Sequence, residues 1–129
     1  MSTQRDLIIS GIRPEIKSKN ELDGALELFE AATLKPILKF QNEIIIAQFR
    51  SYLKKFKHNF NAYNQQVQKD YIHEVMFKDP RIKNSLIASV VSLFTLEEYD
   101  YYGKHKNELN SRIISMLVFR LQVQLERLY

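Results

Sequence analysis

The histidines and the acids near them are the residues that could hold a metal ion. His58, His73 and His105 lie far apart, and none belongs to an H-x-x-x-H or H-E-x-x-H pair, the spacing that puts two ligands on one helix face. Asp70 precedes His73 by three residues, as a carboxylate does in di-iron bundles, but those bundles need two such pairs and two further carboxylates. One pair is typical of a helix surface, and we expect no metal site and no cofactor.

Acids and tyrosines share the segment 97–102 (EEYDYY). Acid–base catalysis would need one buried and one solvated carboxylate, so that their pKa values separate. Glu98 already has a structural explanation, because with Thr95 it forms a capping box that satisfies free backbone N–H groups. The tyrosine rings either pack against neighbouring helices with the hydroxyl group at the surface, or form an exposed surface for a protein partner. The candidate partner surface consists of Tyr99, Tyr101 and Tyr102.

Nucleophiles and phosphate-binding loops have no signature in this sequence. The absence of cysteine excludes a thiolate nucleophile, a disulfide bond and a cysteine zinc site. No serine lies in a G-x-S-x-G turn, and three glycines are too few for a glycine-rich phosphate loop. The sequence therefore favours a protein that is not an enzyme.

A row of basic residues follows the polar face of the stretch 35–58, with Glu43 the only acid among them. Such a row either contacts phosphate groups or is a solvated helix face. No helix-turn-helix or RNA-recognition signature accompanies it, and 19 basic against 15 acidic residues leave only a small positive surplus. Nucleic-acid binding is therefore an alternative hypothesis. The basic ridge consists of Lys39, Arg50, Lys54 and Lys57.

The stretch 35–58 itself predicts one long central helix. Pro36 suits its first turn, because the missing N–H would be unpaired there, and no other proline or glycine follows in the stretch. At 1.5 Å per residue the helix would be about 36 Å long. Its apolar residues cover more than one face, so it should contact at least two neighbouring helices.

Some polar residues interrupt the apolar helix faces. A polar seam within the central helix consists of Gln41, Gln48 and Lys55, which recur every seven residues. Buried glutamines need hydrogen-bond partners, so the seam either sets the register of neighbouring helices or forms the rim of a dimer surface. Arg120 similarly interrupts the last helix, with Glu43 or Glu98 as candidate partners.

Capping signals divide the rest of the chain. Besides the central helix, we expect helices over 21–33, up to about 77, over 80–94, from the capping box to Gly103, and over 108–128. The expected N-caps are Asn20, Asn61 or Asn64, Asp79, Thr95 and Asn107. Pro36 should limit the first helix, so that this helix and the central one are either an angled pair or one kinked helix. Gly103 should be a left-handed C-cap. The last helix has a leucine stripe and a second apolar flank of Met116, Phe119 and Val123.

The sequence as a whole predicts an all-α protein, an irregular bundle of about five helices around one long central helix. A chain of 129 residues with 45% hydrophobic residues is expected to form one domain, 1–129, with 1–19 as an arm or short helix. No alternating strand pattern is present. No secretory or membrane-spanning segment is evident, so we expect a cytoplasmic protein.

Four stretches carry a resemblance to a known family, and together they extend over nearly the whole chain. They are TLKPILKFQNE (33–43), FTLEEY (94–99), ELNSRI (108–113) and RLQVQ (120–124). They resemble a family of small all-α Bacteroidetes proteins, some of which carry the name glyoxalase. Glyoxalases of the vicinal-oxygen-chelate kind use paired βαβββ units and a metal held by His and Glu. This sequence predicts no such units, so the resemblance brings no site residues.

These observations favour a module for protein–protein contact. The broad apolar helices suit an unknown protein partner or self-association, for example as a dimer. Weak nucleic-acid binding by the basic ridge is the alternative, and a glyoxalase-type enzyme is a remote one that rests on the family name.

Overall fold

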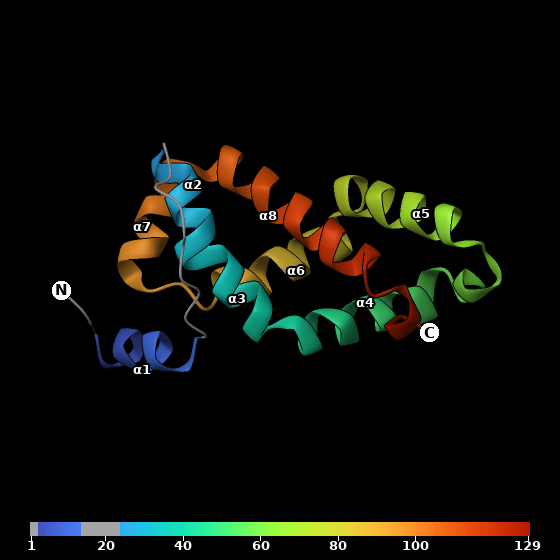
Figure 1. The fold of residues 1–129 in the computed structure, drawn as a ribbon, viewed down its shortest axis with the longest axis horizontal. Helices are drawn as coiled ribbons and strands as arrows, with labels where there is room; N and C mark the ends of the chain where they lie inside the picture. Colours follow the sequence, from blue (N-terminus) through green and yellow to red (C-terminus); the bar gives the residue numbers. More distant parts are fainter. Residues whose placement is uncertain (1–2, 14–23) are drawn as a thin grey trace.

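The computed structural model describes residues 3–13 and 24–129, and the described residues form helices joined by short turns, with no strand among them (Figure 1). The predicted all-α bundle is therefore confirmed. The helices are α1 (Gln4–Ile12), α2 (Ala25–Phe29), η1 (Glu30–Leu34), α3 (Lys35–Phe40), α4 (Asn42–Phe56), η2 (Phe60–Ala62), α5 (Gln65–Lys78), α6 (Pro80–Val91), α7 (Leu96–Lys104), α8 (Lys106–Gln122) and η3 (Leu125–Arg127). The predicted N-cap Asn20 lies outside the described residues.

Of the two alternatives at Pro36, the structure supports one continuous helical segment, because α2, η1 and α3 follow one another without a loop. A proline within a regular α-helix would clash with the carbonyl group four residues earlier. Here the preceding residues form a π-helix, in which the Lys35 N–H donates to the Glu30 carbonyl oxygen. This wider turn displaces the preceding carbonyl groups and accommodates the ring of Pro36, which is buried.

The predicted single helix over 35–58 is interrupted at Gln41, and its second part ends at Phe56. Gln41 has φ −89° and ψ 4°, outside the α-helical region. Figure 1 shows α3 and α4 meeting at an angle at this point. The Gln41 side-chain amide donates to the Ser89 carbonyl oxygen of α6 at 2.8 Å, so a hydrogen bond to a neighbouring helix stabilises the bend.

Of the two alternatives for the polar seam, the contacts support the setting of helix register. The Gln48 amide donates to the Ser89 hydroxyl group at 2.7 Å and accepts from the Ser85 hydroxyl group at 2.5 Å. Together with Gln41, it joins one side of α3 and α4 to the serine side of α6. Lys55, the third member, is exposed and takes no part in this register.

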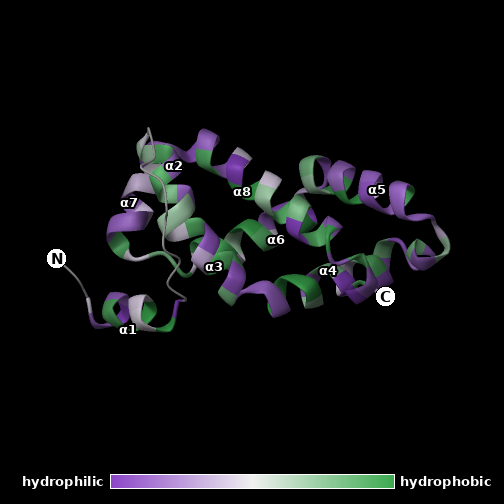
Figure 2. Cartoon of the chain, in the orientation of Figure 1, coloured by the Kyte–Doolittle hydropathy of each residue, from purple (hydrophilic) through white to green (hydrophobic). Residues whose placement is uncertain are grey.

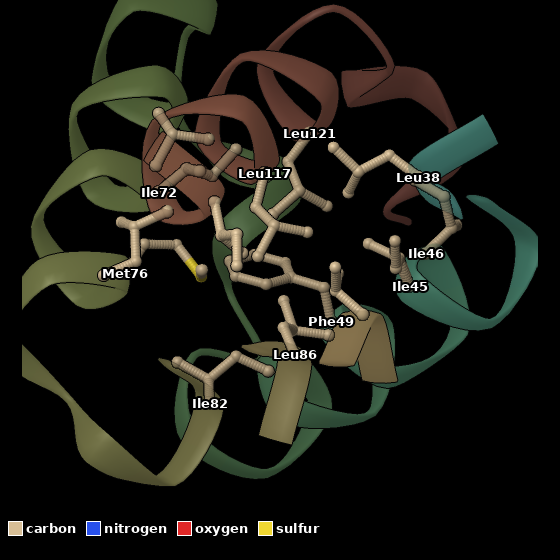
Figure 3. Close-up of a cluster of buried hydrophobic side chains, with 14 of the residues drawn as sticks. Leu38, Ile45, Ile46, Phe49, Ile72, Met76, Ile82, Leu86, Leu117 and Leu121 are labelled. Atoms are coloured by element: carbon tan, nitrogen blue, oxygen red, sulfur yellow. The ribbon is translucent and has the colours of Figure 1, made fainter. Parts of the chain in front are cut away.

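The hydrophobic core lies between α4, α5, α6 and α8, with Phe49 at its centre (Figure 3). Leu86 of α6, Met76 of α5 and Leu117 of α8 extend toward its ring from three helices, and all four side chains are fully buried. Figure 2 shows that α6, in the middle, is mainly hydrophobic, whereas α5 at the edge is mainly hydrophilic. In the described part of the chain, no helix is long and apolar enough to cross a membrane.

The predicted N-caps Asn64 and Asp79 are confirmed, whereas the predicted C-cap Gly103 and the predicted N-cap Asn107 are wrong. Asn64 accepts from the Val67 N–H and Asp79 from the Arg81 N–H, each at 3.0 Å, as N-caps do. Gly103 lies inside α7 with no positive φ, and Asn107 lies inside α8, not before it. The reason is that a single residue, His105, joins the two helices and leaves no room for a separate cap on each side.

Two further helix ends differ from the prediction. The helix expected over 80–94 ends at Val91, and the last helix ends at Gln122 and is followed by the short turn η3, where a helix to 128 was expected. At the end of α6, the Arg5 side chain donates to the Ser92 carbonyl oxygen. At the end of α8, the Gln124 side chain donates to the Arg120 carbonyl oxygen. Side chains thus satisfy carbonyl groups that a longer helix would have paired.

The central position of Phe49 predicts a large effect of its truncation. Phe49→Ala should lower the free energy of unfolding by about 3–5 kcal/mol, because it leaves a cavity between four helices. Urea unfolding followed by circular dichroism measures this value. Ile44→Ala on the same helix is the control, since Ile44 is 48% exposed, and it should cost less than about 1 kcal/mol. Equal losses in the two variants would contradict this description of the core.

Candidate functional site

The three tyrosines predicted to form a partner surface do not share one exposed face. Tyr99 is 55% exposed, but Tyr101 stacks on Phe29 with ring centroids 5.0 Å apart. Tyr102 is buried, and its hydroxyl group donates to Asn110 at 2.6 Å. Because Tyr102 is the only buried residue of α7, tyrosine rings supply the packing that aliphatic residues supply elsewhere. The candidate surface is therefore corrected to Tyr99 alone.

The basic ridge is only partly assembled. Arg50 and Lys54 lie one turn apart on α4 and are exposed, whereas Lys39 lies on α3, beyond the bend. Lys57 is half-buried, with its ammonium group 5.0 Å from the centre of the Tyr63 ring, and a hydrogen bond with Tyr63 raises the pKa of Lys57. The ridge therefore reduces to an exposed pair on α4, and the bend separates Lys39 from this pair.

The acids expected to pair with Arg120 have other partners. Glu43 forms an ion pair with Arg127 of η3, and Glu98 pairs with Arg13. Asp70 accepts a hydrogen bond from Gln66. Within residues 3–13 and 24–129, no three His, Asp or Glu residues lie close enough together to hold a metal ion.

Glu98 is the centre of a polar cluster that joins α1, η1 and α7. Arg13 donates from both terminal nitrogens to its two carboxylate oxygens, at 2.6 and 2.9 Å. The Thr33 hydroxyl group and the Thr95 N–H add two hydrogen bonds, each 2.9 Å long. Burial by itself would raise the pKa of Glu98, but the bonds from Arg13 and the two threonines outweigh it, so the pKa of this carboxyl lies below its ordinary value.

Polar contacts also hold α1 on the turn between α6 and α7. Arg5 donates to the carbonyl oxygens of Ser92 and Phe94 at 2.7 and 2.9 Å, and Asp6 accepts from the Leu96 N–H at 3.2 Å. A cation thus lies at the carboxyl end of α6 and an anion at the amino end of α7, which matches both helix dipoles. The sequence predicted the capping box of Glu98 but not these contacts, because the partners are more than 80 residues apart.

A groove of about 740 Å³ between the η1–α3 segment and α8 is the strongest candidate for a binding site. Four of its lining side chains are apolar, and the others are polar or charged. The lining residues are Glu30, Lys35, Leu38, Lys39, Ser111, Arg112, Ser115, Met116, Phe119, Arg120, Val123 and Gln124. Its volume falls within the usual range of ligand pockets.

Polar contacts join the two walls at each end of this groove. At one end Arg112 of α8 lies 3.2 Å from Glu27 and 3.7 Å from Glu30. At the other end the side-chain oxygen of Asn42 accepts from Arg120 at 3.2 Å and from Gln124 at 2.9 Å. These contacts fix the distance between the two walls at both ends of the groove, and the space between the ends stays open.

Two large apolar side chains of α8 and the turn after it are exposed along the groove. Phe119 is 67% exposed and Val123 is 58% exposed. Both belong to the second apolar flank that the sequence showed beside the leucine stripe of the last helix. This apolar flank was the sequence signal for the groove. Its helical spacing did not show whether another helix would cover the flank or leave it exposed.

The charge along the groove is positive. Lys35, Lys39 and Arg120 form no ion pair among the described residues, and the single lining acid, Glu30, is paired with Arg112. Burial lowers the pKa of Arg120 from its ordinary value. A guanidinium group remains charged at neutral pH all the same, so the groove carries uncompensated cations beside an apolar floor.

A second groove, of about 820 Å³, lies between α1, α2 and α7 and contains the exposed side chains of Leu7, Leu28 and Leu96. Residues 14–23 connect two of its walls and lie outside the described residues.

Comparisons with protein-family models, with curated protein sequences and with solved structures gave no significant match. The resemblance to the small Bacteroidetes proteins therefore stays a prediction, and the candidate site depends on its geometry alone.

The cluster around Glu98 predicts a pH-dependent stability. Since the pKa of Glu98 is lower in the folded than in the unfolded chain, its contribution is complete above about pH 4.3 and is lost as the pH falls through the folded-state pKa. Glu98→Gln should lower the free energy of unfolding by about 2 kcal/mol at pH 7, because Arg13 loses its charged partner. Urea unfolding between about pH 3 and pH 7 measures both effects.

Glu97→Gln is the matched control, because Glu97 is exposed and adjacent to Glu98. It should change the free energy of unfolding by less than about 0.5 kcal/mol and leave the pH dependence intact. A Glu98→Gln variant with the same pH dependence as the unaltered protein would overturn the role assigned to this carboxylate.

Proposed function

We propose that this protein is a module for protein–protein contact and that the groove between α3 and α8 is its docking surface. The observation that carries the proposal is the exposure of Phe119 and Val123 along an open apolar groove. Contiguous exposed apolar surface with a polar rim is typical of interaction sites. Since the chain contains no cysteine, which fits a reducing compartment, we place this module in the cytoplasm.

The arrangement of polar groups favours binding over catalysis. Glu30, the one acid of the groove, is paired with Arg112, and Asn42 is engaged by two partners at the opposite end. An acid–base catalyst would instead need an ionisable group directed at a substrate. The polar residues of the groove hold its walls, while the apolar residues are free to contact a partner.

Exposed apolar side chains can be exchanged without loss of the fold, which makes the proposal testable. Phe119→Asp should reduce partner recovery by about tenfold or more, because a buried aromatic anchor commonly dominates an interface. Its free energy of unfolding should change by less than about 0.5 kcal/mol, since the side chain is largely exposed. Tagged protein is used for pull-down from the native host after nuclease treatment, with quantitative mass spectrometry.

Ile44→Asp is the matched control, because it places the same charge on an exposed apolar position of α4 outside this groove. It should leave partner recovery unchanged. Full recovery with Phe119→Asp, or equal losses with both variants, would exclude the groove as the docking surface.

Nucleic-acid binding is a second candidate function, favoured by one observation. Arg50 and Lys54 are exposed one turn apart, and the only nearby acid of the ridge, Glu43, is engaged by Arg127. Two to three phosphate contacts would give weak binding that falls steeply with salt.

Arg50→Glu combined with Lys54→Glu should then abolish the binding of single-stranded RNA and of duplex DNA in fluorescence anisotropy at low salt. Lys78→Glu with Lys104→Glu is the control, because it changes the net charge equally at exposed positions away from the ridge. Equal losses in the two double variants would indicate unspecific attraction, and no binding by the unaltered protein would rule out this function.

A further inference from the structure

We propose that the occupant of the groove is an acidic amphipathic helix of a partner protein, a specification that rests on the proposed docking function. The apolar face of this helix would lie on Met116, Phe119 and Val123, and its carboxylates would contact the cations of both rims. Three features of the groove support the inference: its length, the positions of its cations, and the hydrogen-bond donors of Arg120 that have no partner among the described residues.

The groove has the length of a short helix. Its walls run from Glu30 to Lys39 and from Ser111 to Gln124. The shorter wall has ten residues, and its nine steps of about 1.5 Å correspond to about 14 Å. An amphipathic helix that binds in a groove places apolar anchors at positions i, i+4 and i+7, and these span about 11 Å. The open apolar floor between the two polar ends therefore fits about two to three turns of helix.

The cations lie on both sides of the apolar floor. Lys35 and Lys39 are exposed one turn apart on the α3 wall, and Arg120 lies on the α8 wall. A partner helix with acids on both borders of its apolar face would place carboxylates against both rims. At the other end of the groove, Arg112 is already neutralised by Glu27 and Glu30, so that end demands no acid.

Arg120 is the most specific of these groups. Its guanidinium group is half-buried, and Asn42 is its one hydrogen-bond partner in the part of the chain that the structure describes. A guanidinium group has five N–H donors and binds a carboxylate through two of them in parallel. A carboxylate from the partner would therefore satisfy donors that the protein itself leaves open.

A second copy of this protein fits the same groove poorly. A symmetric dimer through this face would place the same basic surface, with Lys35, Lys39 and Arg120, on both sides of the interface, and like charges across an interface oppose association. The net charge of +4 points in the same direction, since it favours an acidic partner over a basic one.

The test is selection from a displayed library of helical peptides about four turns long, with a leucine face and random residues along both borders of that face. The full-length protein is the target, and Phe119→Asp is the counter-selection. We expect Asp and Glu to be enriched at the border positions. An enriched peptide and its Asn/Gln counterpart are then compared by fluorescence anisotropy.

The acidic peptide should bind at least about tenfold more tightly than its amide counterpart, and Arg120→Gln should remove most of that difference. Lys39→Gln is a second variant at an exposed position, and it should weaken the acidic peptide by a smaller factor without affecting the fold. Rising salt should weaken the acidic peptide and leave the amide peptide nearly unchanged.

The outcomes separate this inference from the function on which it rests. If neutral or basic peptides are selected and their binding is lost in Phe119→Asp, the groove is a docking surface but its partner is not acidic. If no peptide distinguishes the unaltered protein from Phe119→Asp, both proposals fail. A dimer in light scattering that Phe119→Asp dissociates would assign the groove to a second copy and overturn the inference.

Discussion

The packing of α4 on α6 around Phe49 is the interaction on which the rest of the structure depends. On one side of this contact, the Phe49 ring is buried in the core formed by four helices. On the other side, Gln41 and Gln48 form hydrogen bonds with the serines of α6. A shift of α4 along α6 would break these hydrogen bonds and leave half-buried amides without their partners, which costs stability. The register of the two helices is therefore set by polar contacts and stabilised by apolar ones.

The bend at Gln41 connects this register to the groove. α3 leaves the axis of α4 at that residue. The segments on either side of α3 contact α8, since Glu27 and Glu30 pair with Arg112, and Asn42 at the start of α4 accepts from Arg120. The side chains between these contacts do not close on one another, and Phe119 and Val123 stay exposed. The groove thus follows from a local interruption of a helix and two polar contacts, and the cations along it follow from the polar positions of α3 and α8.

The N-terminal helix is attached by a different principle. Most of its apolar residues face outward, and its contacts to the turn between α6 and α7 are made by Arg5, Asp6 and Arg13. These side chains pair with helix ends and with a carboxylate that already caps α7, so one acid serves two elements. Such contacts depend on charge, whereas the core depends on the burial of apolar side chains.

Local patterns in the sequence determined the helical class, the helix starts at Asn64, Asp79 and Thr95, and the second apolar flank of the last helix. They could do so because capping and helical spacing involve residues within one or two turns of each other. The tertiary structure decided what depends on distant partners. Pro36 continues a helix because a π turn precedes it. Tyr102 is buried, whereas Leu96, the one aliphatic residue of α7, is exposed, and Glu98 pairs with Arg13 across 85 positions of chain. The groove belongs to this second group, since its two walls come from opposite ends of the sequence.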